Sequence, residues 1–350
     1  MWLQCDIMRR SVLFFAVGLT LLSCVPSAAL AHVPQLPGGG GSLHAAIVVS
    51  EPTKSWAIYE HLHEADETVY FRLEMRSGDW LWLGLLTPET GAFAPSLAIM
   101  GPGIAENGTL PARVERPPGA GAMALEGRRG GADYEPFTPG AYYFTVEHDS
   151  IVNTTGTYYV AVYSTSGTGA FSLAVGLRES FTLKEWTLMP VALLRIYRWE
   201  GHSWAFILGP PVATIAVGLA VAVLLARRRG AAFDLFQWMA VLAGLLSIGT
   251  AANVTAQMLD AAATLGGATG GMGITLMFIL LPAAFGLAMG RTGLQAKGPP
   301  TGADRVMMVV LGALSIGLFA GYLVGPAVAL AAALLPERIA MTRVGGAPAG

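Results

Sequence analysis

The chain divides at one junction, FTLKEWTLMPVALLRIYRWEGHSW (residues 181–204), which is followed after one alanine by FILGPPVATIAVGLAVAVLLARRR (residues 206–229). The first half mixes aromatic rings with Lys, Arg and Glu, a composition typical of a segment at a membrane–water interface. The second half has no charged residue from Phe206 to Ala226, and about twenty apolar residues are enough to cross roughly 30 Å of hydrocarbon as a helix. Arg227–Arg229 then ends the apolar run. The residues before this junction favour β structure, and the residues after it favour membrane helices.

Short segments of alternating polarity precede the junction. In Val69–Met75, for example, Phe71, Leu73 and Met75 lie on one face, and Leu81, Leu83 and Leu85 alternate with Trp80 and Trp82 in the next segment. Period-two alternation between turn residues predicts an antiparallel β-sandwich, which we place at residues 46–178 after a flexible leader at residues 32–45. A region rich in Gly and Pro, residues 101–136, predicts a long loop. Similar alternation occurs at residues 141–146, 157–163 and 171–175.

The first 31 residues have the pattern of a secretory signal peptide. A basic Met8–Arg10 precedes an apolar Ser11–Leu22, and Ala29–Ala31 offers a small-x-small cleavage site. Cleavage there would leave His32 as the new N-terminus. The alternative is a lipobox-like Leu21–Cys24, which would be cut before Cys24 and lipidated on it. Both cysteines of the sequence, Cys5 and Cys24, precede His32, so we expect no disulfide in the mature chain.

A family resemblance accompanies the strand pattern. Tyr70–Asp79 with Trp80–Leu85 resembles the opening strands of the pre-peptidase C-terminal (PPC) domain, and Pro95–Gly103 is similar to its next strand and Gly-Pro turn. Gly156–Val162 and Gly169–Gly176 are similar to its closing hairpin. The resemblance spans residues 68–176 and implies a small jelly-roll-like sandwich that serves as an accessory or binding module and has no catalytic residues. Fusion to a multi-span membrane region departs from the family pattern.

Four apolar segments predict an α-helical transmembrane bundle within residues 206–338. The last of them would make a helix of roughly 45 Å, too long for one untilted span, so we expect it to be bent or re-entrant near Gly321–Pro326. The side of the tail, residues 339–350, stays open. The predicted helices cover residues 206–226, 235–258, 272–290 and 306–335.

The distribution of basic residues predicts the orientation. Arg227–Arg229 and a loop with Arg291, Lys297 and Arg305 would share one side of the membrane, whereas the loop at residues 260–271 has no Lys or Arg. The positive-inside rule then places the β domain outside the cell. The aromatic and charged composition of residues 179–205 predicts that this segment lies at the membrane surface. The predicted protein is therefore a multi-pass cell-membrane protein with an extracytoplasmic N-terminal domain.

Charge and motifs narrow the function. Residues 32–204 contain 18 Asp and Glu against 11 Lys and Arg, a difference of −7, which argues against nucleic-acid binding. No Ser nucleophile elbow, Walker loop, HExxH or CxxC motif occurs, so we expect a non-enzymatic protein without cofactor. Its expected partners are the lipid bilayer and a ligand, or another membrane or surface protein, bound outside the cell.

One alternative function depends on histidine. A mature N-terminal His32 would offer both its amine and its imidazole, a donor set that suits copper. His61 and His63 are alternate residues of one segment and could supply a further nitrogen from the same face. Extracytoplasmic copper handling through His32, His61 and His63 is therefore the second hypothesis.

Overall fold

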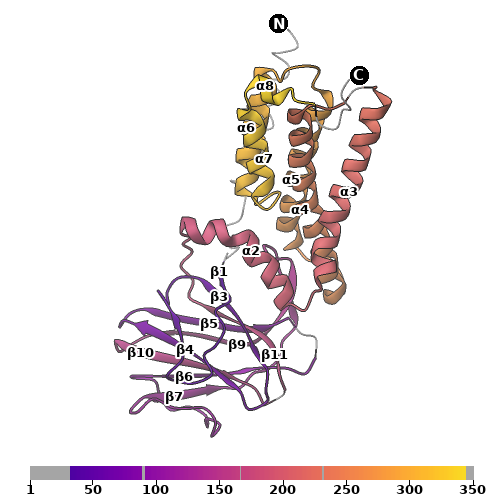
Figure 1. Cartoon of the computed structure of the whole chain (residues 1–350). Helices are drawn as coiled ribbons and strands as arrows, with labels where there is room; N and C mark the ends of the chain where they lie inside the picture. Colours follow the sequence, from indigo (N-terminus) through magenta and orange to yellow (C-terminus); the bar gives the residue numbers. More distant parts are fainter. Residues whose placement is uncertain (1–31, 89–90, 166, 231, 344–350) are drawn as a thin grey trace. The chain divides into compact units, whose positions relative to one another are not determined.

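The computed structural model describes residues 32–88, 91–165, 167–230 and 232–343. The predicted signal peptide, the lipobox alternative and the end of the predicted tail lie outside these residues. The chain forms two compact units (Figure 1). The β-rich unit contains the described residues up to His202 and also Ala261–Ala268, and the helical unit contains Ser203–Asp260 and the described residues from Thr269 onward. The prediction of a β domain followed by apolar helices is confirmed.

The β-rich unit contains two sheets. Nearly all neighbouring strands pair antiparallel; β1 with β3 and β2 with β4 are the parallel pairs. The predicted segments at residues 69–75, 80–85, 141–146, 157–163 and 171–175 all lie in strands. Sheet A has the order β1 (Val33–Gln35), β3 (Trp56–Leu62), β11 (Gly169–Val175), β5 (Trp80–Thr87), β9 (Gly140–Ile151), β8 (Ala132–Glu135), and sheet B has β2 (Ile47–Val49), β4 (Thr68–Met75), β10 (Gly156–Tyr163), β6 (Ser96–Gly101), β7 (Gly121–Leu125).

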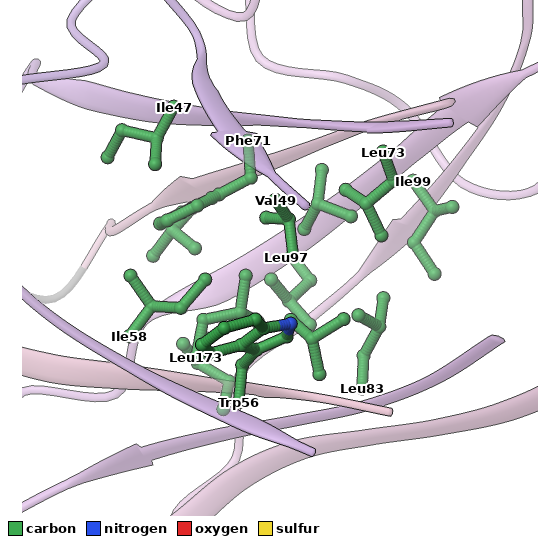
Figure 2. Packing of buried hydrophobic residues seen from close by; sticks show 14 of the residues in the cluster. Ile47, Val49, Trp56, Ile58, Phe71, Leu73, Leu83, Leu97, Ile99 and Leu173 are labelled. Carbon is green, nitrogen blue, oxygen red and sulfur yellow. The ribbon is translucent and has the colours of Figure 1, made fainter. Parts of the chain in front are cut away.

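One hydrophobic core joins the two sheets. The alternation read from the sequence gives most strands an apolar face, and these faces form one buried cluster. Residues on the opposite face of sheet B form a second, smaller cluster. Figure 2 shows Trp56 and Leu173 of sheet A near Phe71, Leu73 and Ile99 of sheet B. The jelly-roll-like closure implied by the family resemblance stays a prediction.

The predicted long loop at residues 101–136 is wrong in part, because it contains β7 and β8. Two of its glycines, Gly121 and Gly127, allow close approach of backbones. A Cβ at Gly121 would lie 1.8 Å from the carbonyl oxygen of Ile104, and one at Gly127 would lie 2.1 Å from that of Pro95. Glycine in a strand often marks such an approach.

The predicted interfacial segment folds as helix α2 (Leu183–Trp199), which belongs to the β-rich unit. It begins at a capping box in which Thr182 and Glu185 satisfy each other's backbone N–H groups. Ile196 and Trp199 pack with Tyr59, Tyr142 and neighbouring residues of sheet A. Trp199 and Tyr197 are 5% and 2% exposed, so these two rings are buried within the protein. The position of the segment at a membrane surface stays a prediction.

Three helices of the described chain are long and apolar enough to cross a membrane. They are α3 (Trp204–Arg228), α4 (Leu235–Leu265) and α5 (Met272–Gln295). The last predicted segment, residues 306–335, differs from a single helix. It is divided into α6 (Gly302–Gly317) and α7 (Val324–Leu334), and a short helix α8 (Glu337–Ala340) follows. Phe319, Tyr322 and Leu323 all have positive φ, a conformation that is incompatible with a continuous α-helix from α6 to α7.

Candidate functional site

One candidate site lies on sheet A, beside the start of β5. Trp80 and Trp82 are alternate residues of β5, so their indole rings share a face. With Thr53, Leu177 and Arg178 they line a cavity of about 310 Å³. We call this cavity the Trp80 cleft.

Polar partners hold the walls of the Trp80 cleft in place. The indole N–H of Trp80 donates to the Oδ1 of Asp149 on β9, while the ring stays 51% exposed. The guanidinium of Arg178 pairs with the carboxylate of Glu51 at 2.6 Å. Glu51 adopts a φ of +51°, a left-handed conformation that costs a residue other than glycine about 1 to 2 kcal/mol. Backbone strain of this kind is often found near functional sites.

His32 lies next to this cleft. Its ring stacks on Trp82 with centroids 6.3 Å apart, and its Nδ1 is 2.6 Å from the hydroxyl oxygen of Ser55. Burial lowers the pKa of His32 to about 4, because a charged imidazole loses hydration there. The imidazole is therefore neutral at physiological pH, the form that binds metals.

His61 and His63 lie elsewhere in the sheet. Their rings stack on each other at 5.6 Å. The register of β1 on β3 puts His32 beside Ser55, and His61 lies six residues further along β3, roughly 20 Å away at the usual rise of a strand. The structure therefore brings His61 and His63 together but not with His32. In the described part of the chain, no group of three or more His, Cys, Asp or Glu is arranged to hold a metal ion.

A second polar cluster lies where α2 ends on sheet A. Tyr142 donates its hydroxyl to Oε1 of Glu200, and Nε2 of His202 lies 3.4 Å from Oε2 of Glu200. The pKa of Glu135 is raised to about 7, because burial and, after it, the nearby carboxyl of Glu200 raise it more than backbone N–H groups lower it. Burial raises the pKa of Tyr59 and Tyr142 as well. This cluster joins the end of α2 to strands β3, β8 and β9.

The sequence showed part of these sites. The alternation of Trp80 and Trp82 with buried leucines placed both rings on the outer face of their strand. Thr53, Arg178 and the Glu135–Glu200 pair had no sequence signal, because each pairing joins residues that are far apart in the chain.

Comparisons with known proteins add little. No family model matches the chain, and no curated protein does, so the PPC resemblance stays a prediction. Among solved structures, the chain is similar to PliG of Aeromonas hydrophila, a periplasmic lysozyme inhibitor of g-type lysozyme, at 16% identity over 37% of this chain and 94% of that chain, with a TM-score of 0.21. It is also similar to CorA of Methylomicrobium album BG8, a surface-associated copper-binding protein important in copper acquisition, at 11% identity over 38% of this chain and 98% of that chain, with a TM-score of 0.22. At these scores neither likeness carries an argument about function.

Proposed function

We propose that this chain is a non-enzymatic, membrane-anchored binding protein whose β-rich unit holds a ligand or partner outside the cell. The Trp80 cleft is the observation that carries the proposal. The apolar helices α3, α4 and α5 support the anchoring role, since each is long enough to cross a bilayer.

The cleft has the properties of a preformed binding surface. Trp80 presents about half of its side chain to solvent while a hydrogen bond to Asp149 restrains its ring. A large aromatic side chain that is already ordered loses little entropy on binding, and such residues often dominate binding energy. Arg178 and Asp149 add charged groups at the edge, so a ligand with an apolar face and polar edges fits best.

The test is binding of the full chain, purified in detergent, to arrays of oligosaccharides and of short peptides. Truncating a dominant aromatic contact costs about 2 kcal/mol or more, so Trp80→Ala should weaken every specific hit by roughly thirtyfold. Trp204→Ala is the matched control, because Trp204 is equally exposed but lies in the helical unit. Hits that Trp80→Ala leaves unchanged, or an absence of hits on both arrays, would contradict the proposal.

Copper handling is the second candidate, and the neutral ring of His32 favours it. The amine of His32 would become a ligand only if the chain is cleaved after Ala31. N-terminal sequencing followed by copper titration tests this. His32→Ala should abolish tight binding, and exposed His44→Ala should leave it unchanged. The geometry favours His32 acting without His61 and His63.

A further inference from the structure

We propose that α6 and α7 form a re-entrant hairpin, which enters and leaves the membrane on the side of Arg227–Arg229 and carries a polar tip into the membrane interior. We call the side of Arg227–Arg229 the basic side. The chain would then cross the membrane three times, and its C-terminal tail would lie on the basic side.

The first argument is length. Helix α6 has 16 residues and α7 has 11, which correspond to about 24 and 17 Å. Neither reaches the roughly 30 Å of hydrocarbon that a spanning helix must cross. The break between them contains Phe319, Gly321, Tyr322 and Leu323 with positive φ, so the two helices do not continue as one.

The second argument is direction. Arg305, in the first turn of α6, donates from Nη1 to the carbonyl oxygens of Ala333 and Leu335 at 2.6 and 2.7 Å. Halfway up, a Cβ at Gly312 would lie 3.2 Å from that of Ala329. The end of α7 thus returns to the start of α6, and Figure 1 shows the two helices side by side.

The third argument is depth. Gly218, near the middle of the apolar part of α3, lies against Leu245 of α4. The next residue of α4, Leu246, contacts Gly321 at the hairpin tip. Gly249, next to Thr250 on α4, lies against Pro211 of α3. The tip therefore lies between the levels of Gly218 and Pro211, inside the apolar layer and past its middle.

Polar groups of α4 hold the tip at that depth. The backbone N–H of Gly321 donates to the hydroxyl of Thr250 at 2.7 Å, and the side-chain amide of Asn253 donates to the hydroxyl of Tyr322 at 2.8 Å. Non-helical backbone is tolerated at membrane depth only where protein or water satisfies it. Gln257, one turn beyond Asn253, is 1% exposed. Its Oε1 has no hydrogen-bond partner among the described residues. The face of α4 that carries Thr250, Asn253 and Gln257 therefore stays polar beyond the tip.

The fourth argument is charge. A hairpin places all eight Lys and Arg that follow residue 206 on the basic side, including Arg338 and Arg343. A fourth span would move those two to the opposite side, against the positive-inside rule. Contacts of the tail agree with the hairpin, since the backbone N–H of Leu235, at the start of α4, donates to the carbonyl of Thr342 at 2.9 Å.

Cysteine labelling of the full chain in cells tests the hairpin. Both native cysteines lie in the predicted signal peptide, so single cysteines can be introduced at exposed positions. Lys297→Cys and Thr269→Cys mark the two sides. With a membrane-impermeant maleimide, we expect Met341→Cys to label together with Lys297→Cys and opposite to Thr269→Cys. Labelling of Met341→Cys together with Thr269→Cys would overturn the hairpin.

Two further variants test the tip. At Gly317 an added Cβ meets no neighbour, so cysteine can be introduced there. With maleimide added on the side of Thr269, Gly317→Cys should label at least tenfold more slowly than Thr269→Cys. If α6 spanned the membrane, the two rates would be similar. Tyr322→Phe removes the hydroxyl that Asn253 bonds, so amide exchange at the tip should become at least threefold faster. The control is Thr292→Val, whose hydroxyl bonds only within its own helix to Ala288. Similar labelling rates, or unchanged exchange in Tyr322→Phe, would count against the assigned tip.

Discussion

Replacing Glu135 by Gln tests the buried cluster at the end of α2 most directly. In the folded chain the pKa of Glu135 is about 7, against an ordinary value of 4.5. The causes are burial first and the carboxyl of Glu200 after it, opposed by backbone donors that include the N–H of Phe137 at 3.0 Å. A glutamine keeps an oxygen for these donors and cannot ionise.

Because the pKa of Glu135 is raised in the folded chain, its ionisation lowers the free energy of unfolding as pH rises. Below pH 4.5 Glu135 is protonated in both the folded and the unfolded chain, so ionisation costs nothing. Between pH 4.5 and 7 the unfolded chain ionises first, so the free energy of unfolding of the wild type falls as pH rises. At about 1.4 kcal/mol per pKa unit, the full loss is at most about 3.5 kcal/mol above pH 7. The Glu135→Gln variant should not lose this stability.

The assay is thermal unfolding of the full chain in detergent, followed by tryptophan fluorescence from pH 4 to pH 8. The wild type should lose on the order of 5 to 10 °C relative to Glu135→Gln across this range. Glu126→Gln is the control, because the side chain of Glu126 is 77% exposed. Parallel curves for wild type and Glu135→Gln would refute the raised pKa of Glu135.

Two further predictions concern the docking of α2. Trp199→Ala should lower the free energy of unfolding by about 3 to 5 kcal/mol, because Trp199 is 5% exposed and packs against sheet A. We expect amide exchange throughout α2 to become faster. Leu188→Ala should leave the exchange unchanged, because Leu188 is 51% exposed. Glu185→Gln should cost about 2 to 3 kcal/mol, because it leaves the ammonium of Lys54, 3% exposed, without its carboxylate at 2.7 Å. Glu185 itself is 22% exposed, which keeps the cost below that of a fully buried pair. Thermal unfolding measures this loss, and an unchanged melting temperature relative to exposed Lys184→Gln would disprove it.

The alternation that predicted the strands also predicted their buried faces. Phe71, Leu73, Leu83 and Leu85 are each 0% exposed, as the pattern required. The prediction of a long loop at residues 101–136 was wrong in part, because it took glycine as a sign of flexibility. Gly121 and Gly127 instead allow close contact between backbones. Composition does not distinguish these two uses of glycine.

The interfacial prediction for residues 181–204 missed the docking of α2 on sheet A for a related reason. Aromatic and basic residues at helical spacing suit a membrane surface and also suit a helix that docks on a sheet. Only the contacts of Trp199 with Tyr59, at 4.8 Å between ring centroids, and with the carbonyl of Glu60, at 3.0 Å, decide between them. The exposed face of α2, which includes Leu188 and Val191, keeps the membrane-surface reading open for that face alone.

The sequence by itself determined the division into a β-rich unit and apolar helices, and most of the strands with their core faces. These depend on local properties, because hydrophobic period and charge-free length act within a few neighbouring positions. The tertiary structure alone decided the docking of α2, the walls of the Trp80 cleft, the raised pKa of Glu135 and the return of α7 along α6. Each of these joins residues that are distant in the chain, such as Glu51 with Arg178 or Thr250 with Gly321, and no local pattern encodes such a meeting.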